Sequence, residues 1–177
     1  MPFEKCAGAV IFRIEPRSRT PKENKFPTGQ ASSLRGRRGK IYYLLLNYAA
    51  IGKVEKTYWG FSKGHIEKGE KEMDAIIREI KEETGIKHLK FLTGFKEAEK
   101  YFFKYKEKTI FKRVYYLLAE TKTKEIKLSF EHLGYKWLFY KKALEKLSFK
   151  NAKRILKKAN EFFKQKETRD KIERKSL

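Results

Sequence analysis

The sequence has little of what a secreted or membrane-spanning protein needs. It contains one cysteine, Cys6, in 177 residues, so an internal disulfide is impossible, as is usual for a chain kept in a reducing cytoplasm. We expect Cys6 to be a small buried hydrophobe. The apolar stretch within residues 1–14 is too short to span a bilayer and lacks a signal-peptide pattern. We therefore expect a cytoplasmic protein with no membrane partner.

Acidic residues are also scarce relative to basic ones. The chain has 22 Asp and Glu against 44 Lys and Arg, a formal net charge of +22. Such a charge attracts polyanions, including nucleotides, polyphosphates, RNA and anionic membrane surfaces, without selecting among them. Hydrophobic residues make up 40% of the chain, which is enough for one domain with its own core.

Three of the four prolines, Pro16, Pro21 and Pro27, fall in one segment, residues 15–40. After Glu15 this segment has eight basic residues and one acidic residue. We predict a basic flexible insertion at about 15–40 between two strands. It interrupts a single domain expected over residues 1–165, which a charged tail follows at 166–177.

The remaining pattern predicts α/β architecture with a mixed sheet between helices. Short apolar or alternating runs predict strands, and 3.6-residue periodicity predicts helices, the first with Gly85 as its C-terminal stop. The predicted strands are 5–14, 41–46, 58–61, 89–103, 109–120 and 135–139, and the predicted helices are 71–84, 141–147 and one after Ser148.

The predicted helix over 71–84 carries the most informative residues. Glu79, Glu82 and Glu83 stand at i, i+3 and i+4, so they share one sector of the helix, beside its apolar face. Like charges this close repel by roughly 0.2–0.5 kcal/mol for each exposed pair, and a divalent cation would remove that cost. Arg78 precedes Glu82 by four residues and can brace it. A merely solvated acidic face is the alternative.

The segment around these glutamates resembles the Nudix box, G-x5-E-x7-R-E-U-x-E-E-x-G-U, where U is aliphatic. Every defined position is filled, by Gly64, Glu70, Arg78, Glu79, Ile80, Glu82, Glu83, Gly85 and Ile86. The resemblance implies an α/β/α sandwich that hydrolyses a nucleoside diphosphate linked to a further group, with magnesium as cofactor and manganese as a substitute.

The same resemblance implies roles for individual residues. The metal positions are Gly64, Glu79, Glu82, Glu83 and Glu120, with Glu131 as the rival of Glu120. The catalytic residues are Arg78 and a general base, for which Glu79 is favoured and Glu83 is next.

The flanking segments resemble the asymmetric diadenosine tetraphosphate hydrolases, in particular KCAGAVIFR, YWGFSKGHIEKGE, GFKEAEKYFF, KRVYYLLAE and LSFEHLGYKW. That family often has Pro where Ser62 stands here, and the basic insertion is a second departure. The resemblance implies that an aromatic pair stacks an adenine, that two lysines bind phosphate and that one histidine lies near the phosphate. These residues are Tyr101 and Tyr135, Lys63 and Lys112, and His65. As alternatives, they are sheet tyrosines, surface lysines and a structural histidine.

The expected partner is a dinucleoside polyphosphate or another nucleotide, with diadenosine tetraphosphate hydrolysed to ATP and AMP. The excess positive charge makes an RNA 5′-end pyrophosphohydrolase the second hypothesis, with RNA as partner. A catalytically idle nucleotide-binding module is the third, and it predicts lost box carboxylates, whereas all are present.

Overall fold

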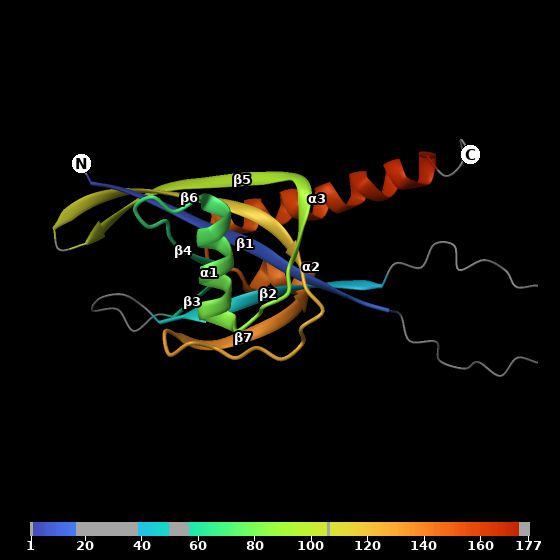
Figure 1. Ribbon diagram of the computed structural model, residues 1–177, viewed down its shortest axis with the longest axis horizontal. Helices are drawn as coiled ribbons and strands as arrows, with labels where there is room; N and C mark the ends of the chain where they lie inside the picture. Colours follow the sequence, from blue (N-terminus) through green and yellow to red (C-terminus); the bar gives the residue numbers. More distant parts are fainter. Residues whose placement is uncertain (1, 17–38, 50–56, 106, 174–177) are drawn as a thin grey trace, which may run out of the picture.

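The computed structural model describes residues 2–16, 39–49, 57–105 and 107–173, with the side chains of Tyr105 and of residues 167–173 left aside. Within these ranges a seven-stranded sheet lies between helices (Figure 1). In chain order the elements are β1 Phe3–Glu15, β2 Lys40–Tyr48, β3 Tyr58–Gly60, β4 Ser62–His65, α1 Glu72–Thr84, β5 Lys90–Tyr105, β6 Lys108–Glu120, β7 His132–Phe139, α2 Tyr140–Lys146 and α3 Lys150–Glu173.

Strand β1 is the centre of the sheet because it has paired strands on both of its edges. On one edge it runs parallel to β6. On the other edge it pairs antiparallel first with β4 and then with β2. The order is β3-β2-β1-β6-β5, with β4 beside β1 and β7 beside β2. The expected mixed sheet is therefore confirmed.

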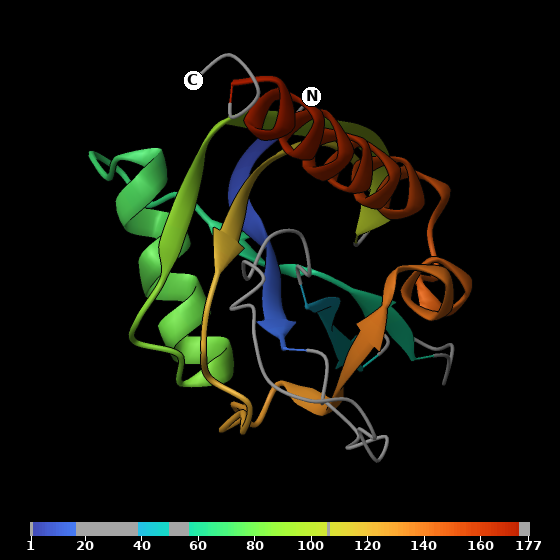
Figure 2. The ribbon, with the colours of Figure 1, turned by 90° about the vertical axis from the view of Figure 1, so that its right-hand side faces the viewer.

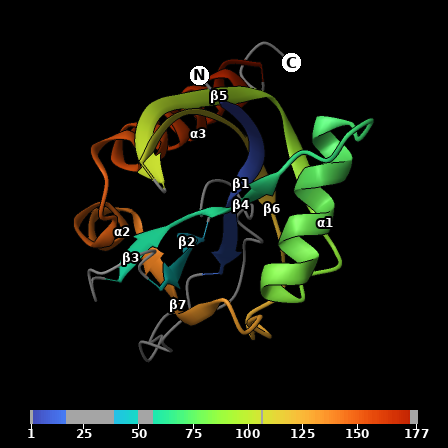
Figure 3. The same ribbon diagram turned by 90° about the vertical axis from the view of Figure 1, so that its left-hand side faces the viewer.

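Alternate residues of β1 face two different cores, as the period of two in a strand requires. Ala7 and Ala9 face the core beneath α1, where their small side chains let the helix approach closely. Val10 and Phe12 face the opposite core, which α2 and α3 cover. Figures 2 and 3 show α1 on one side of the sheet and the other two helices on the other side. These layers form the α/β/α sandwich expected from the sequence.

The structure differs from the sequence-based expectation just before α1. No strand was predicted between residue 61 and the helix at 71–84, but Ser62–His65 is strand β4, paired with Cys6 to Ala9 of β1. The turn itself is confined to the residues after His65, where Gly69 has a φ of +83°. Because Gly64 therefore lies in a strand, its position relative to α1 is fixed by the sheet.

Helix α1 buries only part of the face expected from the sequence. The spacing of the apolar residues predicts that Met73, Ile76, Ile77, Ile80 and Thr84 share one buried face, but Met73 and Ile77 are 39% and 43% exposed. Ile76, Ile80 and Thr84 are buried as expected, and Ala75 and Glu83 are buried beside them. The small Ala75 lets the helix turn this side toward the sheet, and that rotation brings Glu83 into the protein.

Two further expectations concern the chain ends and linkers. Helix α3 continues to Glu173, past the boundary expected at residue 165, while the predicted insertion lies largely outside the described residues. Ser148, expected to cap α3, instead accepts a hydrogen bond from the Trp59 backbone N–H at 2.9 Å. No helix in the described ranges has both the length and the apolar character needed to cross a membrane.

Candidate active site

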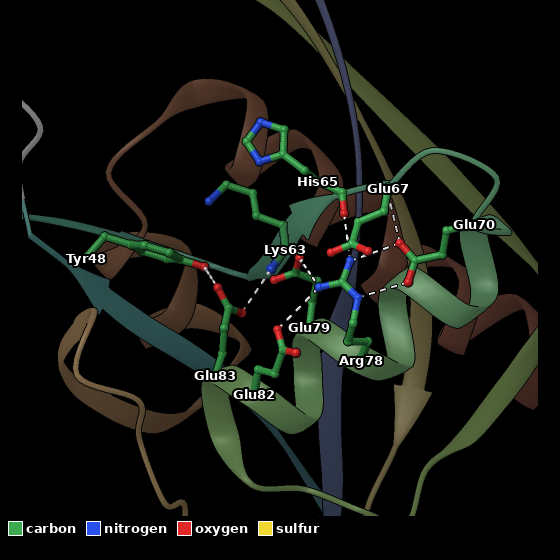
Figure 4. Close-up of polar contacts among 9 residues, drawn as sticks. All are labelled: Tyr48, Lys63, His65, Glu67, Glu70, Arg78, Glu79, Glu82 and Glu83. Carbon is green, nitrogen blue, oxygen red and sulfur yellow. Dashed lines mark hydrogen bonds and ion pairs between the residues drawn. The ribbon is translucent and has the colours of Figure 1, made fainter.

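Arg78 of α1 ties the turn that precedes the helix to the helix itself. Its Nε and Nη2 donate to the two oxygens of Glu70, both at 2.9 Å, and Nη2 also donates to the His65 carbonyl oxygen at 2.9 Å (Figure 4). Nη1 donates to Glu79 at 2.8 Å and to Glu82 at 3.2 Å. The hydrogen bonds from Arg78, together with one from the Glu67 backbone N–H, lower the pKa of Glu70 to about 2. Arg78 therefore positions the surrounding carboxylates, including Glu82 as the i, i+4 spacing predicts.

Gly64 lies where strand β4 passes closest to α1. A Cβ atom at this position would lie 1.7 Å from the carboxylate carbon of Glu79 and 2.0 Å from both of its oxygens. Such contacts are far below van der Waals separation, so a larger residue would expel the Glu79 side chain. Gly64 is therefore required because it leaves room for the Glu79 carboxylate between β4 and α1.

Glu83 is the most buried of the box glutamates, with its side chain 7% exposed. Its Oε2 accepts a hydrogen bond from the Lys63 backbone N–H at 3.1 Å. Its Oε1 lies 3.3 Å from the Tyr48 hydroxyl and 3.3 Å from His132 Nε2. Partners from β4, β2 and β7 therefore hold this carboxylate in place.

Glu79 and Glu82 lie nearer to solvent, with side chains 15% and 59% exposed. Burial raises the pKa of Glu79, as do the neighbouring charges of Glu83 and Glu82, while the hydrogen bond from Arg78 opposes them. Arg78 is already engaged by both oxygens of Glu70, so it cannot fully balance the three box glutamates. A cluster of carboxylate oxygens that keeps excess negative charge and opens to solvent fits a hard divalent cation.

A pocket of about 510 Å³ lies on the other side of the sheet, a volume that suits a small-molecule ligand. Three predicted substrate-binding residues line it: Lys63, Tyr101 and Lys112. Aromatic residues of β3, β5 and the start of α3 form much of the wall, namely Tyr58, Phe102, Phe103 and Phe149. The pocket thus combines apolar ring surface with two ammonium groups.

Lys63 joins this pocket to the carboxylate cluster. Its backbone N–H binds Glu83 on the α1 side, while its side chain lines the pocket. The Lys63 ammonium lies 4.0 Å from the centre of the Tyr48 ring, a cation–π contact. Burial lowers the pKa of Lys63, and the charge of Glu83 opposes that shift.

The expected aromatic pair is not brought together. Tyr101 packs against the core beneath α2 and α3, whereas Tyr135 packs against the core beneath α1. Tyr135 pairs with Leu46 in the β2–β7 ladder, and Leu46 faces α1. The sheet therefore separates the two rings, and they cannot flank the same base.

His65, which was expected to lie near the phosphate, is turned away from the box carboxylates. Its ring points away from α1 in Figure 4, and its Nε2 lies 3.0 Å from Glu4 Oε2. Lys112 also reaches Glu4 Oε2, at 3.0 Å. His65 and the pocket residue Lys112 are thus linked through the carboxylate of Glu4.

The strand register does not bring Glu120 to the cluster. In β6, Glu120 lies four residues beyond Tyr116, which aligns through Gly8 with Lys63, a separation of about 13 Å along the strand. Strand β1 also lies between β6 and β4. Its rival Glu131 is exposed and immediately precedes His132, which contacts Glu83. The geometry favours Glu131 of the two alternatives.

Several residues of the site were not predicted. Tyr48 and His132 hold Glu83 from strands that are distant in sequence, so no local signal marks them. Glu99 lines the pocket, is 6% exposed and accepts a hydrogen bond from the Tyr116 hydroxyl at 2.8 Å. Burial raises the pKa of Glu99. Glu99 stands two residues before Tyr101 in β5, so strand alternation could have placed it on the same face.

The geometry can be compared with known proteins. A family model described as a NUDIX domain matches residues 27–159. The asymmetrical bis(5′-nucleosyl)-tetraphosphatase of Mus musculus is 37% identical over 109 residues, which cover 59% of this chain and 71% of the relative. The RNA pyrophosphohydrolase of Bartonella quintana (strain Toulouse) is 30% identical over 105 residues, covering 58% of this chain and 46% of the relative.

Among solved structures, a binary complex of a C. elegans Ap4A hydrolase aligns with a TM-score of 0.66 and 29% identity, covering 92% of this chain and 98% of that one. The sequence relatives and this structure agree with the resemblance that the box and its flanking segments carry.

The Glu70–Arg78 ion pair predicts a specific pH dependence of stability. A carboxyl pKa that is lower in the folded state contributes stability above its unfolded value, and that contribution is lost as pH falls through the folded value. The unfolding free energy of the wild type should therefore exceed that of Glu70→Gln at neutral pH. The difference should shrink below pH 4.5 and disappear near pH 2. Denaturant titrations across this range measure it.

The matched control is the same substitution in an Arg78→Ala background, where this pH-dependent difference should shrink to the part that the Glu67 backbone N–H contributes. A difference between wild type and Glu70→Gln that stays constant from neutral pH to about pH 2 would contradict the assignment.

Proposed function

Since this chain belongs to the Nudix family of hydrolases, we propose that it cuts a phosphoanhydride bond in a dinucleoside polyphosphate, with diadenosine tetraphosphate as the first candidate. Addition of one water to that substrate yields ATP and AMP. The observation that carries the proposal is the position of Lys63, whose backbone binds Glu83 while its side chain lines the aromatic pocket. The names of the mouse and C. elegans relatives support the same substrate class.

Glu79, Glu82 and Glu83 would hold the divalent cation, for which magnesium is proposed and manganese is the alternative. The excess negative charge of this cluster and its opening to solvent fit a hard cation. When bound, the cation neutralises charge on the phosphate chain and makes water more acidic. Gly64 keeps the space that lets the Glu79 carboxylate remain in this cluster.

Glu79 is the proposed general base. Burial and the charges of Glu82 and Glu83 raise its pKa, which makes it a better proton acceptor than an ordinary carboxylate. Glu83, the second candidate, has its Oε2 engaged by the Lys63 N–H and its Oε1 close to Tyr48 and His132. Glu83 is therefore better suited to holding position, while Glu79 takes the proton from the attacking water.

The pocket would take one nucleoside and the adjoining phosphates. Tyr101 and Phe103, with ring centres 6.2 Å apart, offer ring surface to a base, and stacking of this kind tolerates different bases. The ammonium groups of Lys63 and Lys112 would bind phosphate oxygens and stabilise charge that develops during the reaction. Tyr135 lies on the other face of the sheet, so we do not include it in this pocket.

Hydrolysis at the 5′ end of RNA is the second candidate function. A relative of that name is 30% identical, and the net charge of +22 would favour a polyanion longer than a dinucleotide. The non-catalytic module is the weakest alternative, because every box carboxylate is present.

Replacing the proposed base should abolish most turnover. Glu79→Gln removes the proton acceptor but keeps the side-chain shape, so kcat with diadenosine tetraphosphate should fall about 10²–10⁴-fold. Steady-state kinetics at saturating magnesium measures the change and separates loss of the base from weaker cation binding. The matched control is Glu161→Gln, an exposed position on α3, which should leave kcat unchanged. A kcat within about tenfold of wild type would exclude Glu79 as the base.

Filling the space between β4 and the Glu79 carboxylate should also lower activity strongly, without removing any charged group. Gly64→Ala would place a methyl group on the Glu79 carboxylate and displace it, so kcat/KM should fall by about 10²-fold. Gly134→Ala is the matched control, because a Cβ at that position meets nothing within 4 Å. Circular dichroism should report an intact fold for both variants. Equal activity of the two variants would show that the Gly64–Glu79 approach is unimportant for the reaction.

The two substrate hypotheses can be separated in one assay. At moderate salt and fixed magnesium, kcat/KM for diadenosine tetraphosphate should exceed that for 5′-triphosphorylated RNA by at least about tenfold. Product analysis by mass would identify ATP and AMP directly. A higher kcat/KM for RNA would replace the first proposal by the second.

A chain with a shortened connection between β1 and β2 gives a second test of the two substrate hypotheses. Glu15 pairs with Lys40 across the β1–β2 ladder, so residues 17–38 can be replaced by a two-residue Asn-Gly turn that suits an antiparallel hairpin. The shortened chain should keep its activity on diadenosine tetraphosphate and lose activity on RNA, because the replaced residues include seven of the eight basic residues that follow Glu15 up to Lys40.

A further inference from the structure

Three side chains on β1 and β4 meet on the side of the sheet away from α1. Glu4 and Cys6 alternate along β1, so both face this side, and His65 of β4 pairs directly with Cys6. Their ligand-type atoms, a carboxylate oxygen, a thiol sulfur and an imidazole nitrogen, all lie within 4.8 Å of one another. The box carboxylates belong to α1 and lie on the opposite side.

This donor set differs in kind from the box carboxylates. Sulfur, imidazole nitrogen and carboxylate oxygen are the ligand types that zinc and similar transition metals accept, whereas hard cations such as magnesium prefer oxygen alone. Tetrahedral zinc ligands lie about 3.3–3.8 Å apart for bonds of 2.0–2.3 Å. His65 Nε2 and Glu4 Oε2 are already 3.0 Å apart, so small side-chain rotations would complete such a site.

The burial of the three residues gives the site a closed side and an open side. Cys6 is 1% exposed, the Glu4 side chain is 27% exposed and the His65 side chain is 61% exposed. An ion would reach the sulfur past the imidazole, and three protein ligands would leave a fourth position open to water. Structural zinc sites usually have four protein ligands, so this arrangement matches the open class.

The charge balance also favours a divalent ion. A thiolate and a carboxylate together carry two negative charges, and the nearby Lys112 supplies one positive charge. Lys112 and His65 both contact Glu4 Oε2, so Glu4 can keep Lys112 on that oxygen and offer Oε1 to an ion after a small rotation of the carboxylate. Since Lys112 also lines the pocket, the three residues border the nucleotide-binding region without belonging to its wall.

We propose that Glu4, Cys6 and His65 form a second metal site, selective for zinc-like transition-metal ions and separate from the carboxylate cluster of α1. Binding forms one metal–sulfur, one metal–nitrogen and one metal–oxygen bond, and the proton of the Cys6 thiol passes to solvent. The proposal does not depend on the substrate assignment, because metal binding can be measured without turnover.

Cobalt(II) titration of the full chain tests the site directly. Cobalt accepts the same ligands as zinc, and a cobalt–thiolate bond gives a charge-transfer absorption in the near ultraviolet. Cys6 is the only cysteine, so this absorption can come from no other residue of the chain. With excess magnesium present to occupy the box carboxylates, it should saturate at one equivalent of cobalt, and it should disappear when zinc is added, because zinc lacks this transition.

Variants of each ligand make the test specific. Cys6→Ser should abolish the absorption, and His65→Asn and Glu4→Gln should each weaken cobalt binding at this site by about tenfold or more. Glu82→Gln, which removes a carboxylate from the other cluster, is the matched control and should leave the absorption unchanged. If Cys6→Ser does not fold, the two more exposed positions carry the test alone.

Two results would overturn the proposal. One is cobalt binding without any thiolate absorption, which would place the ion on oxygen ligands elsewhere. The other is unchanged cobalt affinity in both His65→Asn and Glu4→Gln, which would show that neither residue binds the ion together with Cys6. Neither result would bear on hydrolysis, which Glu79→Gln tests separately.

Discussion

The bidentate ion pair between Glu70 and Arg78 determines what the rest of the site can do. Glu70 takes up much of the positive charge of Arg78, which nevertheless still donates hydrogen bonds to Glu79 and Glu82. The helix therefore holds its carboxylates in place without neutralising them. Folding leaves a concentrated negative charge at this point of a chain whose net charge is +22, and such a charge is best balanced by a cation from solution.

The sheet divides the chemistry into two regions. On the α1 side lie the box carboxylates, held by Arg78 and by the contacts of Glu83. On the other side lies the pocket, with its aromatic wall and two lysines. Lys63 belongs to both, because a strand residue can bond through its backbone to one layer while its side chain enters another. A substrate with a base and a phosphate chain matches this division, since its two parts need different surroundings.

The local parts of the site could be predicted from the sequence because helix spacing is rigid. Glu79, Glu82 and Glu83 share one sector of any α-helix, and Arg78 reaches Glu82 in any helix as well. The function of Gly64 was less accessible, since no strand was predicted over residues 62–65, whereas the structure places this glycine in β4 at its close approach to Glu79. The strands and helices were largely predicted, but the rotation of α1 was not, because it depends on which small residues the sheet presents.

The residues whose positions relative to the site could not be predicted depend on strand pairing over long sequence separations. Tyr135 and Tyr101 both looked suitable for stacking, but β7 pairs with β2 in a register that turns Tyr135 toward α1. Glu120 seemed well placed at a strand end, yet its strand is on the far edge of β1 from β4. His132 is held against Glu83 by the same β2–β7 pairing. Alternation within a strand shows which residues share a face, but not which side of the sheet that face is on. A residue whose side is known, such as Lys63, is needed before Glu99 or Tyr101 can be assigned to the pocket.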